Sequence, residues 1–365
     1  MSFAAPIIRR LGLALVLAAM FWGAGCFSPK PFDEEAWQKT VAATDPAKLH
    51  APHRDAQGRF YNPWLVQDKS TWDLLRWWLS SSSLGELNDE DYTVPVVSND
   101  GAYLRDPKAP ASLTWVGHAT YVVQWGGQVV ITDPFFSDSA AVVSRLVPPA
   151  FGIKALPQGV VVLISHNHYD HLDSDAVAAL GDKASLFLCP LGLGEVLKEM
   201  GAKRVKELDW WQSEVVDGTT FTFLPTQHWS RRFGQDYNQS LWGSWMLQRG
   251  KETIYYGGDS GYFKGFKEIG RRWPDIDLAL LGAGAYEPRW FMHYSHMDVP
   301  ELFKAFADLG ARRLVPTQWG VLDLGDGPAA YPAEDIRRYL KKHPQWQGRV
   351  LLMPVGGRVP LEPAK

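Results

Sequence analysis

Apolar and β-branched residues gather into three short stretches between residues 112 and 132: "SLTWVG", "TYVVQW" and "QVVITD". The first two are separated by "GHA" and the last two by a Gly-Gly pair. Turn residues between runs of high β-propensity favour hairpins. The pattern therefore predicts that a β-meander opens the folded domain.

A different pattern follows in "GVVVLISH" (159–166), where β-branched residues run without alternation. Such a run is typical of a strand that is buried on both faces. The next stretch, "DAVAAL" (175–180), predicts a helix that Asp173 or Ser174 caps and Gly181 ends.

Strands and helices continue towards the C-terminus. Strands are predicted within 219–229, 240–248, 252–261, 277–285 and 312–320, and an amphipathic helix within 299–310. This order favours an α/β domain in which two sheets pack together with helices outside them. In "TWDLLRWWL" (71–79), Trp72, Leu75 and Trp78 fall at helical spacing, and ordinary core packing is favoured over membrane contact.

The N-terminus reads as a targeting segment. An arginine pair, an apolar stretch and small residues up to "GAGC" predict a lipoprotein signal peptide over 1–25, with Cys26 as the lipidated first residue of the mature chain. An uncleaved anchor is the alternative, and either one places the protein in the cell envelope, outside the cytoplasm. Residues 26–57 lack periodicity and predict a tether, which leaves 58–361 as the folded domain.

Composition narrows the class of function. A chain of 365 residues that is 46% hydrophobic can bury a sizeable core. Its net charge of −3 and the lack of a basic run argue against a nucleic-acid-binding surface. Two cysteines, Cys26 and Cys189, are too few for a disulfide framework or a zinc ribbon.

Candidate chemistry follows the buried strand in "ISHNHYDHLD" (164–173). His166, His168, Asp170 and His171 offer imidazole and carboxylate groups, the ligands of zinc and similar ions. Two zinc ions need about seven or eight protein ligands, so further ligands are expected at later strand ends. The candidates are His228, Asp259 and His296. A chance cluster of solvated histidines is the alternative.

The order H-x-H-x-D-H, then a distant His and a later Asp, resembles the ligand pattern of the metallo-β-lactamase superfamily. Further stretches resemble the N-acylphosphatidylethanolamine-hydrolysing phospholipase D family within it. They run in order from Gly58 to about Gly320 and include "GRFYNPW", "TWVGHATYVV", "ITDPFFS", "SLWGSW", "GGDSGY" and "GAYEPRWFMHYSHMD".

The resemblance implies an αββα four-layer sandwich with a dinuclear zinc site at one edge. His166, His168 and His228 would hold one ion, Asp170 and His171 the other, and Asp259 would bridge both. The resemblance places His296 near the substrate phosphate, and we expect Asp170 and His296 to act in catalysis. Asp133 in "ITDP" is expected to bond a ligand histidine, although a turn-initiating role is equally compatible with its local sequence.

The chain departs from the family at Gln318, where the family has a histidine that ligates the second ion. An amide oxygen is a weaker zinc ligand than imidazole, so Gln318 predicts a second ion that binds weakly or is another divalent metal. His118 in "GHAT" is expected at the site edge or as an ordinary turn residue. His293 is expected to be exposed.

The implied function is a zinc-dependent phospholipase D-type phosphodiesterase that uses a metal-bridged hydroxide. Its substrate would be an N-acylphosphatidylethanolamine-like phospholipid, and its partner a membrane that holds the lipidated Cys26. One alternative is a hydrolase of another ester or lactone bond in the same fold. A non-catalytic envelope lipoprotein is the other, and Gln318 keeps it open.

Overall fold

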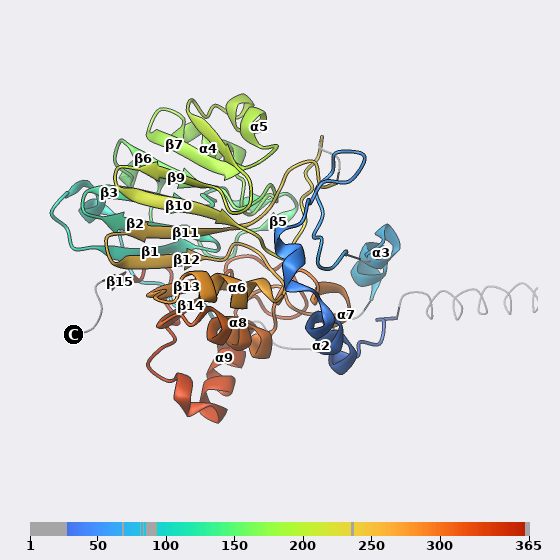
Figure 1. Ribbon diagram of the computed structural model, residues 1–365. Helices are drawn as coiled ribbons and strands as arrows, with labels where there is room; N and C mark the ends of the chain where they lie inside the picture. Colours follow the sequence, from blue (N-terminus) through green and yellow to red (C-terminus); the bar gives the residue numbers. More distant parts are fainter. Residues whose placement is uncertain are drawn as a thin grey trace, which may run out of the picture.

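Two β-sheets pack face to face in the computed structural model, which describes residues 28–67, 69–80, 82, 84, 93–234 and 237–361 (Figure 1). The seven-stranded sheet has the order β15-β1-β2-β3-β6-β7-β8, and the six-stranded sheet has the order β14-β13-β12-β11-β10-β9. Helices α4 and α5 lie beside the first sheet, and α6, α8 and α9 lie beside the second. The predicted αββα sandwich is thus confirmed.

The first sheet consists of β1 (Ser112–Gly117), β2 (Thr120–Trp125), β3 (Gln128–Thr132), β6 (Val160–Leu163), β7 (Ala184–Pro190), β8 (Val205–Leu208) and β15 (Arg358–Pro360). The second consists of β9 (Ser213–Val216), β10 (Thr219–Leu224), β11 (Ser244–Arg249), β12 (Glu252–Tyr256), β13 (Leu278–Gly282) and β14 (Arg313–Thr317). A small hairpin joins β4 (Ser139–Ala140) to β5 (Val143–Ser144).

The α-helices are α2 (Glu34–Ala43), α3 (Thr71–Leu79), α4 (Ser174–Leu180), α5 (Gly194–Glu199), α6 (Gly265–Arg272), α7 (Arg289–Met292), α8 (Val299–Leu309) and α9 (Tyr331–Lys342). Short 3-10 helices are η1 (Pro46–His50), η3 (Ala102–Arg105), η4 (Ile153–Ala155) and η5 (Pro344–Trp346).

The predicted meander is present: β1, β2 and β3 pair antiparallel in sequence order. Strand β6 then pairs parallel with β3 and β7, and both of its faces are buried as predicted. Val161 and Leu163 contribute to the core between the sheets, whereas Val160 and Val162 contribute to the core beneath α4. Burial on both faces is why this strand lacks alternation.

The segment that was expected to be a tether packs against the folded domain over its described residues, 28–57. Within residues 28–57, α2 is capped by Asp33 and buries Trp37 and Val41. The indole Nε1 of Trp37 donates to Glu301 Oε1 on α8 over 3.0 Å. A helix that buries two core side chains is not a free linker, so the domain begins before Gly58.

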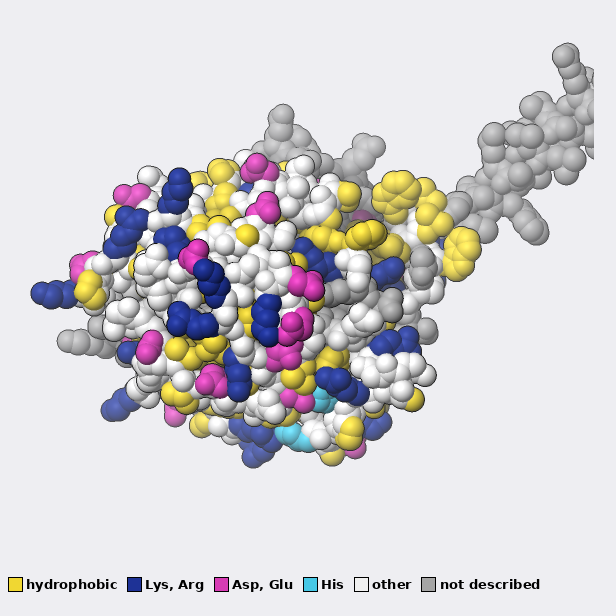
Figure 2. Space-filling view, turned by 90° about the horizontal axis from the view of Figure 1, so that it is seen from above, with side chains coloured by type: hydrophobic (Ala, Val, Ile, Leu, Met, Phe, Trp, Pro, Cys, Tyr) yellow, Lys and Arg dark blue, Asp and Glu magenta, His cyan; other side chains and the backbone are white. Residues whose placement is uncertain are grey.

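Helix α3 forms as predicted, but its packing differs from our expectation. Ser70 and Asp73 form a capping box at its start. Trp72 and Trp78 are 75% and 78% exposed, and Leu74 and Leu79 are also exposed. Figure 2 shows hydrophobic side chains gathered at the right-hand end of the molecule, the end at which α3 lies in Figure 1. Core packing was therefore the wrong expectation for this helix.

The signal peptide and Cys26 lie outside the described residues. No helix in the described part of the chain is long and apolar enough to span a bilayer.

Candidate metal centre

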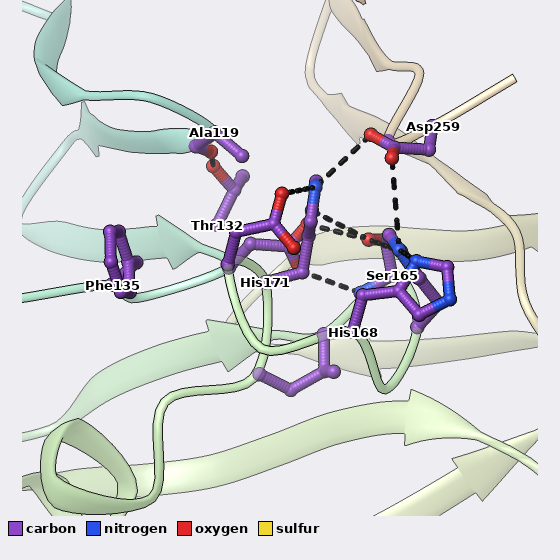
Figure 3. Close-up of polar contacts among 12 residues, drawn as sticks. Ala119, Thr132, Phe135, Ser165, His168, His171 and Asp259 are labelled. Carbon is purple, nitrogen blue, oxygen red and sulfur yellow. Dashed lines mark hydrogen bonds and ion pairs between the residues drawn. The ribbon is translucent and has the colours of Figure 1, made fainter. Parts of the chain in front are cut away.

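The candidate ligands come from loops at one edge of the sandwich, where strands of both sheets end. His166, His168, Asp170 and His171 follow β6 in the first sheet. His228 follows β10 and Asp259 follows β12, both in the second sheet. Figure 3 shows Asp259 pointing towards His171 from a separate ribbon.

One cluster consists of three histidines and a carboxylate. His168 Nδ1 lies 2.9 Å from His166 Nε2 and 3.2 Å from His228 Nε2. Asp259 Oδ2 lies 3.8 Å from His166 Nε2 and 3.5 Å from His228 Nε2. These four atoms lie within 4.8 Å of one another, a spacing that could hold a metal ion.

A second cluster lies on the other side of Asp259. His171 Nε2 is 3.1 Å from Asp259 Oδ1 and 3.4 Å from Asp170 Oδ2. His118 Nε2 is 2.9 Å from Asp170 Oδ2. Asp259 thus presents one carboxylate oxygen to each cluster, the arrangement that a bridging ligand needs.

Asp133 fixes the direction in which His171 presents its free nitrogen. The buried carboxylate of Asp133 accepts hydrogen bonds from His171 Nδ1 (2.6 Å), Tyr256 Oη (2.6 Å) and the Ser165 backbone N–H (2.7 Å). The Ser165 hydroxyl also donates to Asp133, so His166 Nδ1 donates to Ser165 Oγ over 2.9 Å. The expected bond from Asp133 to a cluster histidine is present, and the Nε2 atoms of His166 and His171 both face the clusters.

The polar atoms of the clusters fit metal ions. His171 Nε2 and Asp259 Oδ1 are buried and, among the described residues, have no hydrogen-bond partner. These two atoms lie 3.1 Å apart, and a buried carboxylate oxygen beside an imidazole nitrogen needs either a proton or a metal cation between them. Imidazole nitrogens and carboxylate oxygens are also the donor set that zinc and related ions accept.

Burial sets the charge of the histidines. It lowers the pKa of His168 to about 4 and holds the pKa values of His166 and His228 well below the usual value. These three imidazoles are therefore neutral at pH 7, as metal ligands must be. At His171, burial is outweighed by Asp259 and Asp170, which raise its pKa, so a cation bound there displaces a proton.

The clusters open on a cavity of about 940 Å³. His168, Asp170, His228 and Asp259 reach its wall, and so does His296, whose ring lies 5.6 Å from that of His228. The rest of the wall includes three cations, one further carboxylate and several apolar residues: Arg59, Lys69, Arg231, Asp323, Leu74, Trp77, Val143, Phe291, Met292 and Leu324. Sequence analysis did not assign these cations to the site, although Arg59 lies within the quoted stretch "GRFYNPW".

The side chains of Gln318 and His293 each donate to a backbone carbonyl. The Gln318 amide Nε2 donates to the carbonyl of Gly258 over 3.1 Å, so this side chain binds backbone beside Asp259. His293 was wrongly expected to be exposed: it is half-buried, donates from Nδ1 to the Arg289 carbonyl (2.7 Å), and contacts the rings of Phe32 and Trp37.

Comparison with known proteins gives matches over most of the folded domain. The model of the Beta-lactamase superfamily domain matches residues 128–319. An uncharacterised protein of Mycobacterium tuberculosis is 41% identical over 236 residues, which are 62% of this chain and 63% of that protein. The N-acyl-phosphatidylethanolamine-hydrolyzing phospholipase D 1 of Caenorhabditis elegans is 36% identical over 230 residues, 58% of this chain and 64% of that enzyme.

The chain thus spans less than two thirds of the length of these relatives. Among solved structures, Igni18, a metallo hydrolase from Ignicoccus hospitalis, superposes with a TM-score of 0.55 at 20% identity. The match covers 70% of this chain and 100% of that one, and it establishes the shared fold.

Proposed function

Because the chain belongs to the beta-lactamase superfamily, we propose that it is a metal-dependent phosphodiesterase of the phospholipase D type. Its substrate would be an N-acylphosphatidylethanolamine-like phospholipid, the substrate class named for its Caenorhabditis elegans relative. The observation that carries this proposal is the pair of clusters that share Asp259 and open on one cavity.

The residues fit two divalent ions, which we propose to be zinc. His166, His168 and His228 would hold one, Asp170 and His171 the other, and Asp259 both. When bound, such ions supply an activated water and positive charge for the phosphoryl oxygens. Asp133 keeps the imidazole of His171 in the orientation that this requires.

The cations of the cavity wall favour an anionic substrate over a neutral lactone. Arg59, Lys69 and Arg231 line the same cavity as the clusters. The Lys69 ammonium lies 3.9 Å from the centre of the Phe291 ring, and burial lowers its pKa to about 8, which leaves it mostly charged at pH 7. In the cavity, these cations would replace the water around the negative charge of a phosphodiester. Its phosphorus would then lie at the metal centre.

Helix α3 favours a lipid among the phosphodiesters. Leu74 and Trp77 of this helix line the cavity, and Trp72 and Trp78 extend the apolar surface into solvent. A helix with exposed tryptophan and leucine side chains is suited to the interface of a bilayer. We propose that α3 rests on the membrane, so that a phospholipid enters the cavity along its apolar surface.

We also propose that the protein is held in the cell envelope through a lipidated Cys26, on the sequence signals alone. Such an anchor would keep the cavity near its substrate. The proposal predicts that Cys26→Ser leaves an unprocessed precursor that a fatty-acid probe does not label.

Product analysis tests the proposed activity. The full chain, reconstituted with zinc, is incubated with vesicles that contain N-acylphosphatidylethanolamine, and the lipids are identified by mass spectrometry. We expect phosphatidic acid and N-acylethanolamine, and we expect neither product from His168→Ala or after treatment with a chelator. Zinc-loaded protein that leaves this lipid intact but opens a lactone would favour the alternative hydrolase. A folded, metal-loaded chain inactive on both would favour a non-catalytic role.

A further inference from the structure

We propose that His118, and not Gln318, is the last protein ligand of the second ion. His118 follows β1 in a turn of the first sheet and its side chain is buried at 1% exposure. Its Nε2 atom points at Asp170 Oδ2 from 2.9 Å. The inference deepens the proposed function and rests on its metal centre, but not on its substrate.

The distances bring three ligand atoms together, with Asp259 beside them. Around the second position, His118 Nε2 to Asp170 Oδ2 is 2.9 Å, Asp170 Oδ2 to His171 Nε2 is 3.4 Å, and His171 Nε2 to Asp259 Oδ1 is 3.1 Å. Ligands that bind one zinc tetrahedrally, with bonds of about 2.0–2.1 Å, lie about 3.3 Å from one another. His118, Asp170 and His171 thus place three ligand atoms within 4.8 Å of one another, and Asp259 Oδ1 adjoins them beside His171 Nε2.

Gln318 has a different role in this arrangement. Its Nε2 donates to the Gly258 carbonyl, and its Oε1 lies so close to Gly282 that a Cβ there would be 2.5 Å away. The amide therefore lies between two backbone segments. Because Gly258 directly precedes Asp259, Gln318 is a positioning residue for the strand end that carries the bridging carboxylate.

A matched pair of variants separates these roles. His118 and Gln318 both have positive φ angles, 51° and 65°, and asparagine tolerates this region. His118→Asn keeps the turn but ends before the position of Nε2. Gln318→Asn shortens the amide by one methylene and leaves the four proposed ligands in place. Thermal unfolding of both variants checks that the fold is retained.

NMR spectroscopy identifies the ligand of the second ion directly. The full chain is labelled with ¹⁵N at histidine and loaded with ¹¹³Cd, and the resonance of His118 Nε2 is assigned by its absence in His118→Asn. We expect this nitrogen to be split by coupling to ¹¹³Cd. We also expect calorimetry to show that the unmodified chain and Gln318→Asn each bind two cadmium ions. In His118→Asn, the affinity for the second cadmium ion should be at least a hundredfold lower.

The rival role for His118 is to orient Asp170 by donating a hydrogen bond from Nε2. In that case Nε2 carries a proton and shows no cadmium coupling, which would overturn the proposal. A single cadmium ion per unmodified chain would also overturn it. Neither readout uses substrate, so cadmium coupling at His118 in a protein without phosphodiesterase activity would refute the proposed function alone.

Discussion

Asp133 illustrates how one buried carboxylate controls a metal ligand at the residue scale. It accepts from His171 Nδ1, so the other ring nitrogen of His171 faces Asp170 and Asp259. The same carboxylate is held by Tyr256 and Ser165, which leaves it no freedom to turn away. The proton on Nδ1 therefore fixes the tautomer that a metal requires.

Replacing this carboxylate tests that control. We expect Asp133→Asn to weaken the second ion by about 10–100-fold, because an amide no longer fixes the His171 tautomer. Zinc titration of the metal-free chain measures the effect, with the exposed Asp182→Asn as the control. Equal zinc affinities in all three proteins would show that Asp133 does not orient the ligand.

His293 is a half-buried histidine outside the metal centre, and its burial lowers its pKa to about 4. The unfolded chain takes up a proton at His293 below pH of about 6.5, whereas the folded chain resists it. The stability contributed by neutral His293 is therefore present above pH 6.5 and is lost as the pH falls towards 4. We expect the free energy of unfolding to drop by about 2 kcal/mol between pH 7.5 and 5 from this residue.

Urea denaturation at the two pH values measures this loss in the unmodified chain and in His293→Asn. The variant should lose less stability on acidification, by about the same 2 kcal/mol. A pH dependence that is identical in both proteins would mean that His293 has the same pKa in the folded and the unfolded chain.

At the scale of elements, Trp37 is the largest side chain through which α2 packs on the domain. Trp37 is only 8% exposed and bonds Glu301 on α8. We expect Trp37→Ala to lower the free energy of unfolding by about 3 kcal/mol, because it removes a buried indole and leaves an acceptor with one donor fewer. Trp72→Ala, on the exposed side of α3, should change it by less than about 0.5 kcal/mol. Chemical denaturation that shows similar losses for both would contradict the packing of α2.

The sequence predicted the strands of the sandwich better than it predicted how α3 and residues 28–57 pack against the domain. Strand β6 could be recognised because burial on both faces leaves an unbroken apolar run. Helical spacing in α3 revealed an apolar face, but spacing does not show whether another element packs on that face. Residues 28–57 read as a tether because α2 buries only Trp37 and Val41 among charged neighbours.

The candidate site could be predicted as far as its motif extends. The H-x-H-x-D-H loop was identified by its residue types and spacing, and His228 and Asp259 were identified by their places at later strand ends and by the family resemblance. The contact between His118 and Asp170 joins residues 52 positions apart, and only the folded chain brings them together. The same holds for Arg59, Lys69 and Arg231, which come from separate loops to one cavity.

At the scale of the whole molecule, the metal centre, the cations and α3 lie along one cavity. In this arrangement, membrane binding and hydrolysis would depend on different residues. Helix α3 would contact the bilayer, and the clusters would act on the phosphodiester. We expect the double variant Trp72→Ser/Trp78→Ser to lower kcat/KM at least tenfold on vesicles. Its turnover of the soluble bis(p-nitrophenyl) phosphate should stay unchanged.

A matched control is Val215→Ser, which removes an apolar side chain that is 63% exposed on β9. It should leave both activities unchanged. Equal losses on vesicles and on the soluble substrate in the tryptophan variant would show that α3 supports the site and does not contact lipid.

The central claim is that water, activated at the metal centre, attacks the phosphorus of a phospholipid. Hydrolysis of N-acylphosphatidylethanolamine vesicles in H₂¹⁸O by the zinc-loaded chain tests it, with mass spectrometry of both products. We predict one ¹⁸O atom in the phosphate of phosphatidic acid and none in N-acylethanolamine. Label in the alcohol product, or no release of the headgroup by a protein that holds both ions, would contradict the account.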